Sequence, residues 1–238
     1  MEGETQIPSA DPFLKILEGG LAHTAHKWKH YLPLYHRYFS PYRRLAGERQ
    51  VIVLEIGVQN GGSLDMWNAY FGRENCQIYG VDIHPACRSL EGGNVKIFQG
   101  SQLDPEFLRS LPGKMPSPDI IIDDGGHSAK MQVSSLEILF PFLRPGGIYL
   151  CEDTHSSYMK QYIDQSPTFV EYARAAVDQL HAHWLPPARK SRGELARWCS
   201  GLHFHNSMIF FDKSERPAEA PAVRYWRGAE PEIFPTSG

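Results

Sequence analysis

Short apolar runs, punctuated by glycine, recur along the middle of the chain. Runs of this kind, separated by helix-length segments, are typical of β-α-β units on a parallel sheet. Five such runs predict parallel strands at 51–56, 77–83, 95–98, 119–124 and 147–153. Two later runs, 202–205 and 207–213, predict a closing pair of strands joined by a tight turn at Asn206.

Apolar residues at helical spacing lie between these runs and predict helices at 63–71, 105–111 and 132–143, with helical and connecting material over 156–198. The pattern therefore predicts a Rossmann-like α/β domain, with a mostly parallel seven-stranded sheet and helices on both faces.

An aromatic helical face precedes the first predicted strand, and it predicts an N-terminal helical cap over residues 1–47. Pro33 suits the first turn of a helix, whereas Pro41 is expected to end or kink it. The predicted domain then covers 48–213, and a tail rich in proline, alanine and glutamate covers 214–238.

Length and charge narrow the class of protein. The 238 residues fit one domain with a full core. With 24 Lys and Arg against 27 Asp and Glu and no long basic run, a nucleic-acid partner is not expected. No apolar stretch approaches a membrane span and the N-terminus is unlike a signal peptide, which predicts a cytoplasmic protein without a membrane partner. The four scattered cysteines form no CxxC pair, so a disulfide framework is not expected.

The segment LEIGVQNGGSL (54–64) follows the first predicted strand and resembles a cofactor-binding turn. Its glycines allow a backbone to approach a ligand closely, and Asp82, which ends the second strand, can accept hydrogen bonds from ribose hydroxyls. The turn is not GxGxxG, and Glu55 before Gly57 would repel a pyrophosphate. An acidic turn instead suits the positively charged sulfonium of S-adenosyl-L-methionine.

The segment GSQLD (100–104) follows the third strand, where it is either an ordinary polar turn or a contact to the adenine edge. The cofactor contacts that we expect are Glu55, Gly57, Ser63, Asp82, Gly100, Ser101, Gln102 and Asp123.

Acidic residues also end the fourth and fifth predicted strands, where Asp124 stands after one and Glu152 and Asp153 after the other. The carboxyl ends of neighbouring strands meet at one edge of an open sheet. Three carboxylates with no Lys or Arg near them in sequence favour a hard divalent cation, and we expect Mg²⁺. His127 follows Asp124 by three residues and is predicted to be a general base, with a metal ligand or a helix-capping residue as the alternatives.

Six segments occur in an order that makes the chain similar to a known family: HKWKHYLPLYHRYF, LEIGVQNGGSLDMW, YGVDI, IIIDDGGH, LRPGGIYLCEDTHSSY and GLHFHNSMIFFDK. The chain resembles the metal-dependent sugar O-methyltransferases of antibiotic pathways over roughly residues 20–213. The resemblance implies a class I methyltransferase fold that ends in an antiparallel strand. It also implies Mg²⁺ held by Asp124, Glu152 and Asp153, with His127 as the base.

Two departures from the family limit what the resemblance implies. Gly126 stands where the family commonly has serine, which affects one hydrogen bond. The chain is also shorter than the macrolide-modifying members, so their auxiliary domain, macrolide substrate and assembly are not expected, and homo-oligomerisation stays open.

The expected function is O-methylation of a hydroxyl on a sugar or glycosylated small molecule, dependent on S-adenosyl-L-methionine and Mg²⁺. Two alternatives stay open: methylation of a catechol-like vicinal oxygen acceptor, and a non-catalytic cofactor-binding partner of an oxygenase. In the N-terminal segment the residues that match the family either cap the cofactor, line the acceptor pocket or form a plain amphipathic helix; these are His26, Lys27, Trp28, His30 and Tyr31. His155 is a second candidate polar contact, and His203 and His205 are expected to be structural.

Overall fold

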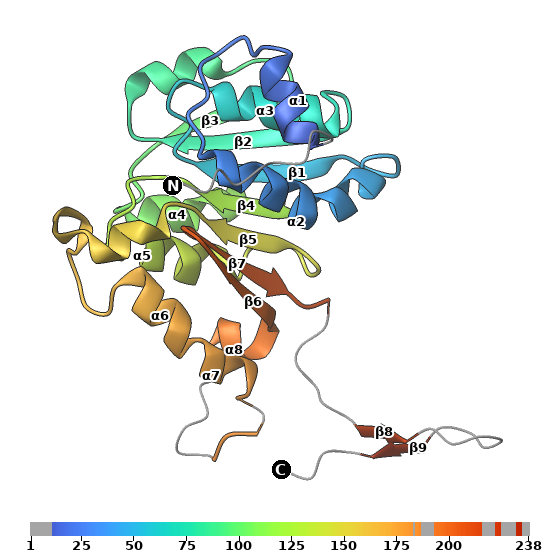
Figure 1. Cartoon of the computed structure of the whole chain (residues 1–238), viewed down its shortest axis with the longest axis vertical. Helices are drawn as coiled ribbons and strands as arrows, with labels where there is room; N and C mark the ends of the chain where they lie inside the picture. Colours follow the sequence, from blue (N-terminus) through green and yellow to red (C-terminus); the bar gives the residue numbers. More distant parts are fainter. Residues whose placement is uncertain (1–10, 183, 187–192, 216–221, 225–231, 235–238) are drawn as a thin grey trace, which may run out of the picture.

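The structure, a computed structural model, describes residues 11–182, 184–186, 193–215, 222–224 and 232–234. A seven-stranded sheet with the order β3-β2-β1-β4-β5-β7-β6 forms the centre of the molecule (Figure 1). Strands β1 to β5 are parallel, and β7 is antiparallel to both β5 and β6. The strands are β1 Val51–Ile56, β2 Cys76–Asp82, β3 Val95–Gln99, β4 Ile120–Asp123, β5 Ile148–Cys151, β6 Cys199–His205 and β7 Met208–Lys213. The predicted mostly parallel sheet and its closing antiparallel strand are confirmed.

The central strand β1 is buried along its whole length, which explains why it reads as a continuous apolar run. Its side chains alternate between two cores, so that Val53 packs on one face of the sheet and Leu54 on the other. Helices cover both faces, as the pattern predicts. They are α1 Pro12–Glu18, α2 Leu32–Leu45, α3 Gly62–Phe71, α4 Pro105–Ser110, α5 Ala129–Leu139, α6 Phe169–Ala175, α7 Val177–Leu180 and α8 Glu194–Trp198.

Helices α1, α2 and α3 cover one face of the sheet. Helices α1 and α2 lie within the predicted N-terminal cap, and α3 follows β1. Helix α1, which the pattern did not predict, begins after Asp11, whose side chain accepts hydrogen bonds from the backbone N–H groups of the first turn. Helix α2 does not end at Pro41 but continues to Leu45. Burial of its aromatic face offsets the hydrogen bond that proline removes, and Tyr42 beyond Pro41 donates to the Gly146 carbonyl oxygen at 2.9 Å.

The opposite face carries α4, α5 and α6, with Leu108, Leu136 and Phe169 fully buried against it. Short 3₁₀ helices complete the connections at Lys29–Tyr31, Pro85–Leu90, Leu111–Gly113, Thr154–Tyr158 and Lys160–Tyr162. In the predicted tail, β8 Ala222–Arg224 and β9 Glu232–Phe234 form a separate antiparallel pair. Among the described residues, no helix combines the length and the apolar character that crossing a bilayer requires.

Candidate active site

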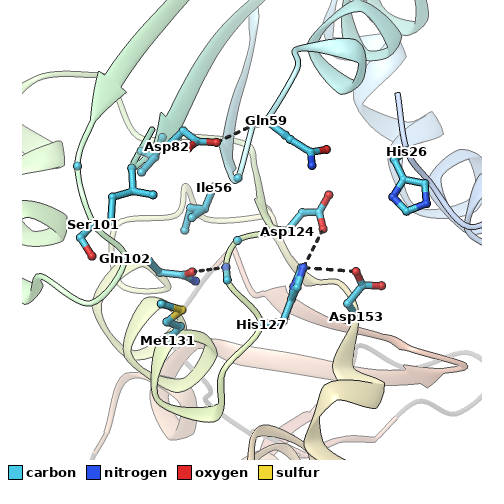
Figure 2. Close-up of a pocket in the computed structure, with 16 residues that line it drawn as sticks. His26, Ile56, Gln59, Asp82, Ser101, Gln102, Asp124, His127, Met131 and Asp153 are labelled. Carbon is cyan, nitrogen blue, oxygen red and sulfur yellow. Dashed lines mark hydrogen bonds and ion pairs between the residues drawn. The ribbon is translucent and has the colours of Figure 1, made fainter. Parts of the chain in front are cut away.

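A cavity of about 320 Å³ opens at the carboxyl edge of the sheet, where β1, β2, β4 and β5 end (Figure 2). This is the edge at which open α/β sheets bind their ligands. Most of the residues predicted from the motifs line it: Gly57, Asp82, Gly100, Ser101, Gln102, Asp124, His127 and Asp153.

Asp82 stands at the cavity wall with a fixed carboxylate. Its Oδ2 accepts a hydrogen bond from the Gln59 backbone N–H at 2.9 Å, and its Oδ1 accepts one from the His84 backbone N–H at 2.8 Å. Just after β1, Gly57 has a φ of +87°, and a Cβ there would overlap the carbonyl oxygen of Asp124. Only glycine fits this turn, which brings the ends of β1 and β4 together.

Glu55 and Ser63, two of the predicted cofactor contacts, do not line the cavity. Glu55 is fully buried, and its Oε2 accepts hydrogen bonds from the Ser63 hydroxyl at 2.8 Å and the Trp67 indole at 3.0 Å. Burial raises the pKa of Glu55 to about 7, although nearby Lys27 opposes the shift. Both residues therefore support the turn after β1 from the buried side.

Asp123 also lies behind the cavity wall, because successive side chains of a strand point to opposite faces. It accepts hydrogen bonds from the Gln102 amide at 2.6 Å and the Tyr149 hydroxyl at 3.0 Å. Burial raises its pKa to about 7. Gln102 lines the cavity, but its Oε1 accepts the Gly126 N–H at 3.1 Å, so its amide group holds the loop after β4.

Asp124, His127 and Asp153 form a group whose potential ligand atoms all lie within 4.8 Å of one another. His127 Nε2 lies 3.5 Å from Asp153 Oδ2 and 4.0 Å from Asp124 Oδ1 (Figure 2). His127 and Asp153 both have positive φ, at 59° and 52°. Such conformations cost free energy in residues other than glycine, and they occur often at functional sites. His127 Nδ1 is buried and has no hydrogen-bond partner among the described residues.

Glu152, the third predicted metal ligand, uses both carboxylate oxygens elsewhere. Tyr35 donates to Oε1 at 2.7 Å, and Lys27 donates to Oε2 at 3.0 Å. Lys27 Nζ also lies 2.6 Å from Asp124 Oδ2 and 3.7 Å from Glu55 Oε1. No Lys or Arg lies near these carboxylates in the sequence, but in the fold Lys27 reaches them from the N-terminal segment.

The charge of Lys27 is balanced by that cluster. Burial lowers the pKa of Lys27, but the carboxylates of Asp124, Glu152 and Glu55 raise it by more, so it stays well above its ordinary value. Burial in turn raises the pKa of Glu152 to about 8, against the opposing effect of Lys27. Removal of one partner from such a buried cluster would leave an uncompensated charge.

Residues 21–31, which we call the covering segment, bring Lys27 to this cluster. Its chain passes so close to α3 that a Cβ on Gly62 would overlap the backbone of Thr24 and Ala25. His26 lines the cavity, while Trp28 and Tyr31 donate to Asp153 Oδ1 at 3.0 and 2.7 Å. Residues 21–28 lie outside the helices and strands, so the amphipathic-helix alternative does not hold for His26 and Lys27.

Three further histidines that the sequence singled out make polar contacts near the site or on the closing hairpin. His155 Nδ1 is 3.9 Å from Asp153 Oδ1, and its ring packs edge-on against Trp28. His203 pairs with Asp212 at 2.6 Å on the closing hairpin, and His205 bonds to the Tyr38 hydroxyl at 2.8 Å.

Apolar lining residues were not predicted as site residues: Ile56, Val81, Ile83 and Met131. The sequence offers one signal for them, because the apolar Ile83 ends the predicted strand 77–83 directly after the predicted ribose-binding Asp82. In the structure 69% of Ile83 is exposed, and it offers the cavity an apolar face.

Comparison with known proteins defines the class of the chain. Residues 54–154 match the family model described as a methyltransferase domain. The chain is 38% identical, over 81% of its length, to 8-demethyl-8-alpha-L-rhamnosyl tetracenomycin-C 2'-O-methyltransferase of Streptomyces olivaceus, of which 53% is covered. It is 34% identical, over 77% of its length, to mycinamicin VI 2''-O-methyltransferase of Micromonospora griseorubida, of which 48% is covered.

A solved structure agrees with these relatives. The MycE methyltransferase of the mycinamycin biosynthetic pathway, in complex with Mg, SAH and mycinamycin VI, matches 77% of this chain and 48% of its own, with a TM-score of 0.70 and 34% identity. The fold and the matched domain are those of a class I methyltransferase. Within that class, the chain is similar over more than three quarters of its length to sugar O-methyltransferases of antibiotic pathways, and it spans about half the length of the curated relatives that it matches.

Proposed function

We propose that the chain binds S-adenosyl-L-methionine at the carboxyl edge of its sheet and, with Mg²⁺, methylates a hydroxyl of a sugar-containing small molecule. One observation carries the proposal: Asp82 and the Asp124, His127 and Asp153 group line the same cavity. A nucleoside bound at Asp82 and a hydroxyl bound at the Asp124, His127 and Asp153 group would therefore lie side by side. The named substrates of the relatives are glycosides, which supports a sugar acceptor.

The cofactor half of the cavity has the groups that a nucleoside needs. Asp82 carries a carboxylate that two backbone N–H groups orient, and a carboxylate at the end of β2 can accept the ribose hydroxyls. Ile83 offers an apolar surface next to it, which suits the face of an adenine ring. Gly57 keeps the turn free of a side chain where the sulfur end would pass.

The acidic half of the cavity fits a hard divalent cation. Asp124 and Asp153 offer carboxylate oxygens, the ligands that Mg²⁺ prefers, within the 4.8 Å group. Glu152 would join them only if Lys27 moved away from its Oε2. When bound, the cation would lower the pKa of an acceptor hydroxyl.

His127 would accept the proton from that hydroxyl at Nε2, the ring atom that faces both carboxylates. The same atom is the one that the ring could offer to a metal, so the base and ligand roles exclude each other. Asp124 and Asp153, through the cation that they would bind, would keep the acceptor oxygen beside Nε2, and holding two reactants in line is itself a large part of such catalysis.

Calorimetry with S-adenosylhomocysteine tests the binding half of the proposal. Asp82→Asn should weaken binding by about 1–3 kcal/mol through lost charge-assisted hydrogen bonds. Glu106→Gln, at an exposed carboxylate on α4, is the matched control and should bind as the wild type does. A wild-type protein that binds no S-adenosylhomocysteine would overturn the cofactor assignment.

Transfer of labelled methyl from S-adenosyl-L-methionine to a panel of rhamnosides and catechols tests the reaction. We expect turnover on glycosides, loss of turnover in EDTA and recovery on addition of Mg²⁺. Turnover on catechols alone would support the vicinal oxygen alternative. Cofactor binding without transfer to any acceptor would favour the non-catalytic alternative, and full activity after exhaustive chelation would remove Mg²⁺ from the mechanism.

A further inference from the structure

His26 stands on the covering segment, and its imidazole faces the cavity (Figure 2). Within the described residues it takes part in no hydrogen bond or ion pair. Its neighbours along the chain are all engaged: His23 bonds to Asp65 at 2.8 and 3.0 Å, Lys27 to the carboxylate cluster and Trp28 to Asp153. His26 therefore has its hydrogen-bonding capacity available on the side where a ligand would lie.

The charges around the cavity would repel one end of the proposed cofactor. Three ionisable lining residues, Asp82, Asp124 and Asp153, are acidic. S-adenosyl-L-methionine carries its own carboxylate at the amino-acid end, and this carboxylate would be repelled by the acidic lining residues. That carboxylate needs a donor that the acidic residues do not already occupy.

The other basic side chains near the cavity cannot serve that carboxylate. Lys27 Nζ lies between Asp124 and Glu152, and only 3% of its side chain is exposed. His127 turns its Nε2 toward Asp153 at 3.5 Å. Among the described lining residues, His26 is the basic side chain that remains.

The position of His26 fits the direction in which the cofactor would extend. Figure 2 places Asp82 and Ser101 on one side of the cavity and His26 on the opposite side, with Gln59 and Asp124 between them. With its ribose at Asp82 and its sulfur near Gly57, the cofactor would extend its amino-acid end toward His26. The backbone of Thr24 and Ala25 against Gly62 fixes the segment in that place.

We propose that His26 binds the carboxylate at the amino-acid end of S-adenosyl-L-methionine, donating an imidazole N–H to it. The inference rests on the proposed function, because it presumes that this cofactor occupies the cavity. It separates the roles of two neighbours on one segment: His26 serves the cofactor, and Trp28 serves the carboxylate of Asp153.

Two ligands that differ only in this carboxylate provide the test: S-adenosylhomocysteine and its decarboxylated form, S-adenosyl-3-thiopropylamine. Calorimetry on the full chain should show that His26→Ala weakens S-adenosylhomocysteine binding by about tenfold, the worth of a charge-assisted hydrogen bond at an accessible site. Affinity for the decarboxylated ligand should stay the same. His26→Gln, which keeps an N–H donor, should recover part of the lost affinity.

His23→Ala is the matched control, since His23 lies on the same segment but bonds to Asp65. It should leave the preference for the carboxylate-bearing ligand unchanged. An equal loss for both ligands in His26→Ala would mark a structural role and overturn the proposal, as would an unchanged affinity for S-adenosylhomocysteine. If the wild type binds neither ligand, the proposed function fails first, and that result is distinct from both.

Discussion

Trp28 Nε1 donates a hydrogen bond of 3.0 Å to Oδ1 of Asp153, so the covering segment orients a carboxylate at the end of β5. The Tyr31 hydroxyl donates to the same oxygen at 2.7 Å. The other oxygen, Oδ2, is left facing His127 at 3.5 Å. Two donors from the N-terminal region thus determine which oxygen of Asp153 is presented to a cation.

Trp28→Phe should therefore weaken metal binding without removing the aromatic ring. We expect an affinity for Mn²⁺, as a spectroscopic substitute for Mg²⁺, that is about three- to tenfold lower, because one of two hydrogen bonds that orient Asp153 is lost. Titration followed by electron paramagnetic resonance measures it. Trp184→Phe, at an exposed tryptophan beyond α7, is the control. An unchanged Mn²⁺ affinity in Trp28→Phe would show that Tyr31 alone suffices.

Lys27→Met should destabilise the metal-free protein. Removing one partner of a buried ion pair leaves uncompensated charge, at a cost of about 3–5 kcal/mol. Denaturant unfolding in EDTA at about pH 9, above the pKa values of about 7 and about 8 for Glu55 and Glu152, measures the loss, and Lys29→Met, at an exposed lysine, serves for comparison. Added Mg²⁺ should recover part of the stability of Lys27→Met, because a second cation then neutralises the carboxylates. A variant as stable as the wild type would show that the cluster is protonated rather than paired.

Lys27 also marks the limit of what the sequence could predict. The strand positions follow from apolar runs punctuated by glycine, and Asp82, Asp124 and Asp153, at the ends of those strands, line one cavity. Lys27 lies 97 residues from Asp124, and no local pattern joins them. Their contact depends on how the covering segment crosses the sheet edge, which only tertiary packing decides.

A second limit concerns the direction of side chains at strand ends. Asp123 and Asp124 are adjacent, but alternation along β4 turns Asp123 into the core toward Tyr149 and leaves Asp124 at the cavity. Glu55 is likewise turned inward to Ser63. A motif places these residues at the correct strand end, and the register of the strand then decides which of them a ligand could contact.

The buried Asp123 should make stability depend on pH. Its pKa is about 7 in the folded protein against 3.8 for an ordinary aspartate, so the folded state keeps a proton that the unfolded state loses. Folded stability should therefore fall as pH rises from about 4 to about 7, by at most about 1.4 kcal/mol per pH unit. Asp123→Asn, which does not ionise, should lack this contribution.

Unfolding free energies of both proteins in EDTA, at several pH values from 5 to 8, provide the measurement. The difference should shift in favour of Asp123→Asn as pH rises and level off above about pH 7. Glu106→Gln, at an exposed carboxylate, should track the wild type throughout. A difference that does not change with pH would mean that Asp123 is ionised in the folded protein.

His127 could act through Nε2 either as the general base or as a metal ligand, because Nε2 faces both Asp124 and Asp153. A variant of His127 distinguishes these two roles. If it accepts the proton, His127→Ala should lower kcat by about 10²–10⁴-fold, the usual worth of general base catalysis. Affinities for S-adenosylhomocysteine and Mn²⁺ should stay close to those of the wild type. The acid limb of the wild-type pH–rate profile should be absent from the variant.

A His127→Ala variant that loses Mn²⁺ affinity in parallel with kcat would instead identify a metal ligand. One that keeps a near-normal rate would mean that another group takes the proton. His155 is then the residue to change next, since its Nδ1 lies 3.9 Å from Asp153 Oδ1 and has no hydrogen-bond partner among the described residues. His155 lies near Oδ1 of Asp153, whereas His127 lies near Oδ2, and the His155 ring packs against Trp28. With His155 as the base, the acceptor hydroxyl would therefore have to approach from the covering segment rather than from the loop after β4. The double variant His127→Ala, His155→Ala would then lose the rate that the single variant keeps.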